Sequence, residues 1–178
     1  MTALAKFRSP VGTLAVEASD RGVCGVRFGG GERARPPITA RTRENLEAGL
    51  RALADYFHGR PPRLPPLDLH GTPFRLAVWR ELIAIPWGDV RTYGEVAERM
   101  GRPGAARAVG GANHHNPVAI LVPCHRVVAG GGRLGGYAGG VAVKAKLLAH
   151  EAANAPALRP EPRTGGERPP AGPQGRAR

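Results

Sequence analysis

The stretch of sequence that decides the fold is Asn116-Pro-Val-Ala-Ile-Leu-Val-Pro-Cys124-His-Arg-Val-Val128. Its apolar run over residues 118–122 predicts a buried strand. Pro123 interrupts the hydrogen-bond ladder of that strand, so Cys124 is expected at the strand end, where reactive groups are often displayed. Neighbouring side chains of an extended chain point in opposite directions. Contact between Cys124 and His125 therefore requires a bridging water or a turn at the cysteine.

The chemistry of a cysteine nucleophile sets conditions on its surroundings. The thiol must ionise near neutral pH, so its pKa has to fall below the free value of about 8.5. His125 can take the proton if a carboxylate holds its ring and stabilises the imidazolium. Glu151 is the first acidic residue after Cys124, and it closes a helix expected over residues 141–150. The sequence allows this carboxylate to fold back on the cysteine without requiring it.

Three interpretations of Pro-Cys-His-Arg stay open on these residues alone. The cysteine is a buried structural residue beside a chance histidine, a metal ligand, or a nucleophile, with a cysteine hydrolase as the obvious form. The metal interpretation is weak, because His114-His115 is the only other cluster of possible ligands. No metal is expected.

The sequence before this stretch predicts helices. Thr72-Pro73 is an N-cap followed by proline at the first helical position. Thr92 and Glu95 fit the T-x-x-E capping box, which begins a short helix. A third helix is expected over residues 105–112, and it consists almost wholly of small residues.

Two short helices across a glycine turn predict a helix-turn-helix, although such pairs also occur in ordinary cores. The only long side chain of the second helix is Arg107. A smooth helix with a single arginine suits close approach to a narrow groove of DNA. The alternative is a surface arginine on a buried alanine helix.

The first half of the chain predicts a small α/β unit. Short strands are expected over residues 4–7, 13–17 and 23–28, and a helix over residues 39–58. A proline-rich linker over residues 59–71 then separates residues 1–66 from a second unit at 72–154. Cys24 lies in the third strand and is interpreted as a small buried hydrophobe.

Composition limits the class of protein. The 178 residues carry a formal net charge of +12, almost all from arginine, which permits a nucleic-acid partner. A GC-rich genome explains the arginine count equally well. No run reaches the roughly 18 apolar residues of a membrane span, and no signal peptide is recognisable, so a cytoplasmic protein is expected. The Pro/Gly/Arg-rich residues 155–178 are expected to be a disordered tail.

Several motifs together resemble one known family. Residues 116–128, followed by Gly135-Gly-Tyr137-Ala-Gly-Gly140 and Leu147-Leu-Ala-His-Glu151, are similar to the O6-alkylguanine-DNA alkyltransferases of the bacterial, single-function type. The resemblance extends upstream through Gly88-Asp-Val-Arg-Thr-Tyr93 and Ala105-Ala-Arg107. It covers residues 73–151 strongly and the first half only in outline.

The resemblance implies a fold and an activity. The fold is α+β in two domains, a ribonuclease-H-like α/β domain followed by a helical winged helix-turn-helix domain that carries the cysteine. The activity is direct reversal of DNA damage, in which an alkyl group, mainly methyl, moves from O6 of guanine to Cys124. Transfer is stoichiometric and irreversible, and O4-alkylthymine is left open as a second substrate. No cofactor is implied. The expected partner is double-stranded DNA, bound by a monomer through the minor groove.

The resemblance also implies residue roles. His125 acts as base through water, Glu151 orients it, Tyr93 donates to the departing guanine, and Asn116 holds the turn before the active segment. Arg107 fills the space left when the damaged nucleotide rotates out of the duplex. The other residues expected to contact DNA are Ala106, Gly110, Ala112 and Asn113. The residues expected to hold the flipped base are Val127, Tyr137, Ala138 and Gly139. Each tyrosine also has a purely structural alternative. Tyr93 could serve as a hydrophobic staple of its own helix, and Tyr137 could be a loop aromatic that packs on the core.

At two positions the sequence departs from the family, and these departures change the expected contact to guanine and exclude a structural zinc site. Ala138 stands where some relatives have serine, so a backbone amide must replace any hydroxyl contact to guanine. Cys24 alone cannot form the structural zinc site that some members have. A second hypothesis is a lesion-binding protein without transfer activity, but such relatives lack the cysteine that Cys124 provides here.

Overall fold

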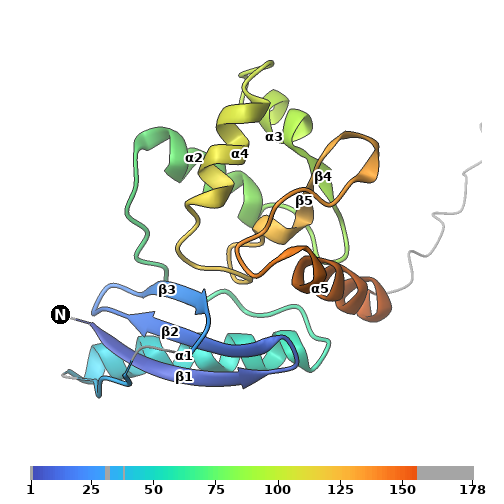
Figure 1. The fold of residues 1–178 in the computed structure, drawn as a ribbon. Coiled ribbons are helices and arrows are strands. Elements are labelled where there is room, and N and C mark those ends of the chain that lie inside the picture. Colours follow the sequence, from blue (N-terminus) through green and yellow to red (C-terminus); the bar gives the residue numbers. More distant parts are fainter. Residues whose placement is uncertain (1, 31–32, 38, 156–178) are drawn as a thin grey trace, which may run out of the picture.

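The computed structural model describes residues 2–30, 33–37 and 39–155 (Figure 1). The expected disordered tail lies outside the described residues, apart from Ala155. The fold is mixed α/β, with a small antiparallel sheet and helices. Within the described residues, no helix is long and apolar enough to cross a membrane.

The first half is a three-stranded meander covered by one helix. Strands β1 (Ala3–Ser9), β2 (Gly12–Ala18) and β3 (Val23–Phe28) pair antiparallel in sequence order. Helix α1 (Ala40–Phe57) begins at the N-cap Thr39, whose side chain accepts a hydrogen bond from the amide of Thr42. Its buried stripe packs on the sheet and closes the first part of the core. These elements match the predicted ones to within two residues at each end.

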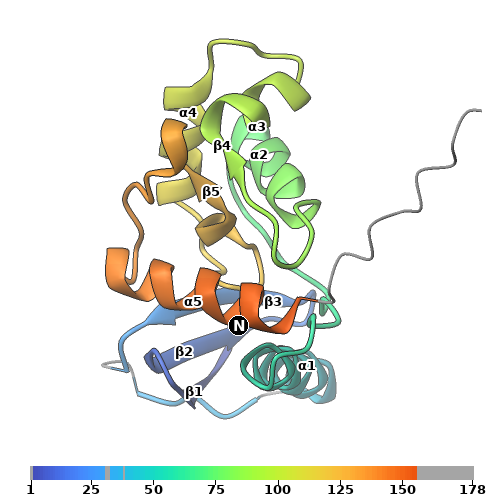
Figure 2. The same ribbon diagram turned by 90° about the vertical axis from the view of Figure 1, so that its right-hand side faces the viewer.

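As far as the structure describes it, to Ala155, the second half contains four α-helices. Helix α2 (Pro73–Ile83) is capped by Thr72, and α3 (Tyr93–Arg99) begins with the complete capping box of Thr92 and Glu95. Helices α4 (Ala106–His114) and α5 (Val141–Asn154) follow. Two-residue strands β4 (Arg91–Thr92) and β5 (Val127–Val128) pair in parallel, and a short 3-10 turn covers Gly130–Gly132. Figures 1 and 2 show α5 at the boundary between the sheet unit and helices α2–α4.

The predicted strand over residues 118–122 is wrong. The segment is a tight turn in which the amide of Val122 donates to the carbonyl of Val118 at 2.9 Å. At the turn, Ile120 has φ 71°, a conformation that costs a β-branched residue roughly 1–3 kcal/mol. The run is apolar because every residue in it is buried. Because every residue of the run is apolar, the sequence shows no alternation of apolar and polar residues that would distinguish a strand from a buried turn.

Strand β3 anchors this turn to the sheet. The amide of Val26 donates to the carbonyl of Pro117 at 2.9 Å, and the amide of Ala119 donates back to Val26 at 3.0 Å. The edge of the first unit thereby continues into the segment that leads to Cys124. Cys124 itself begins a 3-10 turn, Cys124–Arg126, so a turn at the cysteine, one of the two expected alternatives, is present.

Two smaller expectations also need correction. Cys24 is partly exposed rather than buried, because its side chain lies on the opposite face of β3 from Val23, which packs in the core. Helix α5 continues to Asn154, so Glu151 lies one turn inside the helix rather than at its end. Glu151 is nevertheless fully buried, which places its carboxylate in the core.

Candidate active site

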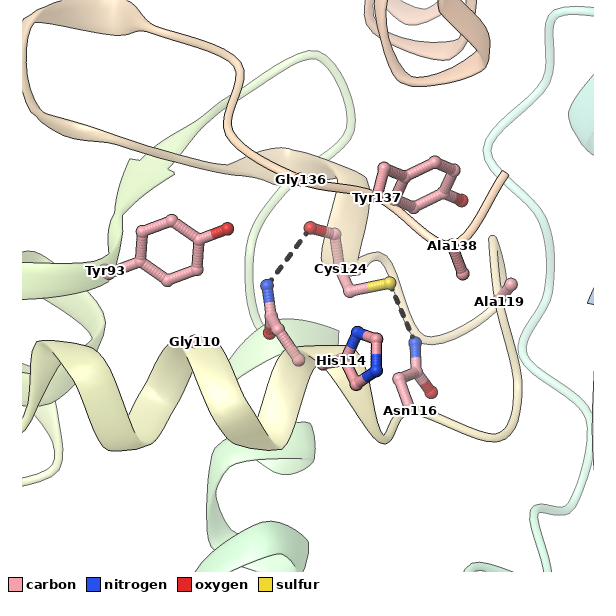
Figure 3. Close-up of a pocket in the computed structure, with 10 residues that line it drawn as sticks. Tyr93, Gly110, His114, Asn116, Ala119, Cys124, Gly136, Tyr137 and Ala138 are labelled. Atoms are coloured by element: carbon pink, nitrogen blue, oxygen red, sulfur yellow. Dashed lines mark hydrogen bonds between the residues drawn. The ribbon is translucent and has the colours of Figure 1, made fainter. Parts of the chain in front are cut away.

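A pocket of about 400 Å³ opens beside Cys124 (Figure 3). This volume lies within the range of small-ligand sites. The pocket collects residues from α3, α4, the turn before Cys124 and the loop before α5. Its lining residues are Tyr93, Gly110, Asn113, His114, Asn116, Ala119, Cys124, Gly136, Tyr137 and Ala138.

The sulfur of Cys124 is held by Asn116. The side-chain amide of Asn116 donates to Sγ at 3.0 Å and to the carbonyl of Val122 at 2.8 Å, while its Oδ1 accepts from the amide of Val118. The side-chain amide of Asn113 donates from Nδ2 to the backbone carbonyl of Cys124 at 3.3 Å. Asn116 therefore fixes both the turn and the thiol.

Burial raises the pKa of the Cys124 thiol above its ordinary value. The Asn116 hydrogen bond and the charge of Lys144 oppose this effect without overcoming it. The thiol is therefore protonated at neutral pH in this state. A nucleophilic sulfur at this position needs a base to remove the proton when the reaction begins.

His125 and Glu151 form a buried pair behind the cysteine. His125 Nε2 lies 2.5 Å from Oε1 of Glu151, and both side chains are almost inaccessible. Burial opposes ionisation of Glu151, but hydrogen bonds and charges from His125 and Arg126 outweigh it and hold its pKa at about 2. Because an ionised carboxylate only accepts hydrogen bonds, Nε2 carries the proton.

The other ring nitrogen of His125 is left free. Nδ1 is buried and has no hydrogen-bond partner among the described residues. Burial lowers the pKa of His125, despite the opposing effect of Glu151, so the ring is neutral at pH 7. A neutral imidazole with Nε2 protonated presents a lone pair at Nδ1, which is the form a general base requires.

Arg126 completes the charge balance of this pair. Its Nε donates to Oε2 of Glu151 at 2.8 Å, and its Nη2 donates to Oε1 at 3.1 Å. Nη1 donates to the carbonyl of Ile85 at 2.6 Å, and the guanidinium lies over the ring of Trp87. The amide of Gly88 donates to Oε2 at 3.1 Å. The charge of the Glu151 carboxylate is thus balanced by the Arg126 guanidinium even while His125 is neutral.

Two tyrosines border the pocket in different ways. The Tyr93 hydroxyl is directed toward Cys124 (Figure 3), and burial raises its pKa although the neighbouring Asn113 side chain lowers it. Gly135 passes over this hydroxyl with φ 69°, and a Cβ there would lie 3.3 Å from the oxygen, so only glycine suits the position. Tyr137 packs edge-on against Phe28 and His125.

The predicted site residues fall into three groups. Tyr93, Gly110, Asn113, Asn116, Cys124, Tyr137 and Ala138 line the pocket, and His125 and Glu151 lie directly behind it. Arg107 is exposed on α4, with Ala106 half-buried beside it. Ala112, Val127 and Gly139 do not line the pocket: Ala112 and Val127 are buried, and a Cβ on Gly139 would meet the ring of Phe28 at 3.0 Å.

Sequence reasoning missed four polar contributors. Arg126, Lys144 and Tyr56 are buried polar side chains that hold this site together, and His114 adds an imidazole to the pocket. Arg126 stood in the quoted motif, and its position beside His125 was the available signal. Lys144 and Tyr56 lie within helices whose apolar residues recur at helical spacing. In such a pattern the sequence does not show whether the polar end of a long side chain is buried or reaches solvent.

No group of three or more possible metal ligands occurs within the part of the chain that the structure describes. The fold and the pocket together define a small α/β protein in which a helical unit presents one buried cysteine to a pocket. A base and an oriented carboxylate stand behind that cysteine.

Comparison with known proteins identifies the family. Residues 73–153 match the family described as "6-O-methylguanine DNA methyltransferase, DNA binding domain". The chain is 44% identical over 153 residues to the methylated-DNA–protein-cysteine methyltransferase of Mycolicibacterium paratuberculosis, covering 84% of this chain and 92% of that protein. It is 40% identical over 148 residues to the one from Methanosarcina acetivorans, covering 80% and 93%.

A solved structure agrees with these relatives. The crystal structure of Mycobacterium tuberculosis OGT in complex with DNA has a TM-score of 0.74 and 39% identity, covering 85% of this chain and 94% of that one. The chain belongs to the methylated-DNA–protein-cysteine methyltransferase family, whose activity is DNA repair by alkyl transfer.

Proposed function

We propose that this protein repairs DNA by transferring an alkyl group, mainly methyl, from O6 of guanine to Cys124, once per molecule. The observation that carries the proposal is the position of the Cys124 sulfur, which faces a pocket of about 400 Å³ while the His125–Glu151 pair lies behind it. Relatives that share 40–44% of their residues with this chain carry the matching name.

The transfer is a single displacement. The thiol proton passes through water to Nδ1 of His125, and the Glu151 carboxylate, which Arg126 holds in place, stabilises the resulting imidazolium. Sγ forms a bond to the alkyl carbon while the carbon–O6 bond breaks and its electron pair leaves with guanine. The Tyr93 hydroxyl donates a hydrogen bond or proton to the departing base, which relieves its charge. The product thioether has no easy reversal, so one protein is consumed per lesion.

DNA binding falls to helices α3 and α4, acting as a winged helix-turn-helix. Helix α4 approaches the minor groove, because its small residues allow close contact. The exposed Arg107 then occupies the space of the flipped nucleotide, with Ala106, Gly110, Ala112 and Asn113 nearby along the helix. Flipping costs a few kcal/mol and is required because O6 is unreachable inside the stack.

The loop before α5 holds the flipped base. Tyr137, Ala138 and Gly139 cover it, and backbone groups here and at Val127 read its edge. The packing of Tyr137 and Gly139 on Phe28 supports this role, since it fixes the loop from the side of the sheet. O4-alkylthymine is a second candidate substrate for the same pocket.

We assign the chain to two domains, residues 1–66 with a ribonuclease-H-like layout and residues 72–154 for DNA binding and alkyl acceptance, joined by the proline-rich linker. The protein acts as a monomer in the cytoplasm. These assignments rest on the family resemblance, and the order of elements along the chain supports the two domains, because the sheet and α1 precede the helical half.

Mass spectrometry after incubation with a methylated oligonucleotide tests the proposal. The expected result is one added methyl group, located on Cys124. Cys124→Ala should abolish labelling and retain DNA binding, while Cys24→Ser, which removes the other cysteine, should label as the unmodified protein does. Labelling that persists in Cys124→Ala, or several turnovers per molecule, would refute stoichiometric transfer.

A further inference from the structure

Tyr56 is a residue of the sheet-bearing unit that reaches the reactive site. It lies near the end of α1, is fully buried, and contacts Trp87, His150 and His125 with its ring. Its hydroxyl donates to Oε1 of Glu151 at 2.9 Å. The same hydroxyl oxygen lies 3.3 Å from Nε2 of His125. No other residue of α1 makes a hydrogen bond to the His125–Glu151 pair among the described residues.

Three donors converge on one carboxylate oxygen. Oε1 of Glu151 accepts from Tyr56, from Nε2 of His125 and from Nη2 of Arg126. Oε2 accepts from Nε of Arg126 and from the amide of Gly88. Arg126 and Gly88 come from the same half of the protein as Glu151 itself. Tyr56 is the one donor contributed by the other half.

We propose that Tyr56 is a positioning residue for alkyl transfer, which holds Glu151 and His125 in the arrangement that leaves Nδ1 of His125 as the base. This inference rests on the proposed function. The hydroxyl limits rotation of the carboxylate, and its oxygen shares the Nε2 proton. The first domain thereby takes part in the chemistry of the second and is more than a support for its fold.

The charged and titratable groups around His125 set the expected pH response. They are Glu151 and Lys144 from α5, Tyr56 from α1, Tyr137 from the pocket loop, and Cys124 and Arg126 from its own turn. Of these, Tyr56 acts on His125 chiefly through the carboxylate. Loss of its hydroxyl leaves Glu151 with one donor fewer, so the carboxylate holds the imidazolium more tightly. His125 then stays protonated to higher pH.

The test is Tyr56→Phe, which keeps the ring and its packing and removes only the hydroxyl. Single-turnover transfer from a saturating methylated duplex is measured as a function of pH. The plateau rate should fall about three- to tenfold, and the acid limb should move to higher pH by roughly 0.5–1 unit, as expected for the loss of one hydrogen bond of typical strength. DNA affinity should be unchanged.

A matched control comes from the same helix. Thr42 is also buried in α1, and its hydroxyl donates to the carboxylate of Asp20, which makes no hydrogen bond to the His125–Glu151 pair. Thr42→Val should lose stability as Tyr56→Phe does, with no change in rate or pH profile. If Tyr56→Phe matches the unmodified protein in both, or if both variants slow transfer equally without moving the acid limb, the positioning role is wrong.

A second measurement needs no variant. Nitrogen NMR of the histidine rings in the unmodified protein should show His125 neutral and protonated at Nε2. Protonation at Nδ1 would overturn the inference even if the tyrosine variant does not fold. Failure of the unmodified protein to accept a methyl group is a separate result, which would overturn the proposed function instead.

Discussion

Arg126 binds both carboxylate oxygens of Glu151, through Nε to Oε2 at 2.8 Å and Nη2 to Oε1 at 3.1 Å. The two side chains are 8% and 1% exposed, so water cannot replace either partner. This pair joins the segment after Cys124 to α5, and the His125 contact depends on the position it gives the carboxylate.

Replacement of Arg126 by methionine should destabilise the protein strongly. The change keeps an unbranched side chain but leaves the buried Glu151 charge without its main partner, which costs about 3–5 kcal/mol. Urea unfolding of Arg126→Met against the unmodified protein measures this loss. Arg99→Met is a control, because the Arg99–Glu81 pair is exposed and should contribute at most about 1 kcal/mol. Equal losses in the two variants would contradict the buried-pair interpretation.

The stability of the protein should depend on pH through Glu151. Its folded pKa of about 2 lies below the ordinary value of 4.5. The folded state therefore binds the proton less readily than the unfolded state. The resulting stabilisation is complete above about pH 4.5 and is lost as pH falls toward 2.

Comparison with Glu151→Gln isolates this effect from other carboxylates. The difference in unfolding free energy between the unmodified protein and the variant should be constant from pH 5 to 7 and shrink between pH 4.5 and 2. Acid-dependent chemical denaturation measures it. A difference that stays constant across the acidic range would show that folding does not lower the pKa of Glu151.

Asn116→Ala should make the thiol of Cys124 harder to ionise. Burial already raises the pKa of this thiol, and the hydrogen bond from Asn116 is the leading effect that lowers it. The rate of modification by a small thiol reagent, followed against pH, should shift to higher pH in the variant. Cys24 should be replaced by serine in both proteins, so that only one thiol reacts. An unchanged curve would mean that the amide does not stabilise the thiolate.

Arg107→Ala should separate base flipping from transfer. Arg107 is exposed on α4, and no hydrogen bond or ion pair joins it to another described residue, so its removal should leave folding within about 0.5 kcal/mol. Transfer from a methylated duplex should slow by tenfold or more, because filling the vacated stack offsets a cost of a few kcal/mol. Transfer from a free O6-alkylguanine base should be unaffected. Equal slowing with both substrates would place Arg107 in the chemistry instead.

Local signals in the sequence were sufficient for most elements. Thr72-Pro73 and the Thr92–Glu95 capping box fixed helix starts, because capping depends on residues within one turn. The segment before Cys124 was different. A run of five buried apolar residues carries no alternation, and the contacts with Val26 that shape it as a turn come from the distant strand β3.

The sequence by itself determined the Pro-Cys-His-Arg motif around Cys124 and the family, since these depend on residue identity at fixed spacing. Only the tertiary structure decided the partners of Glu151, because five donors from Tyr56, Gly88, His125 and Arg126 meet there across separations of up to 95 residues. It also decided that the thiol rests protonated. Burial sets that state, and burial follows from the packing of the whole chain around Cys124.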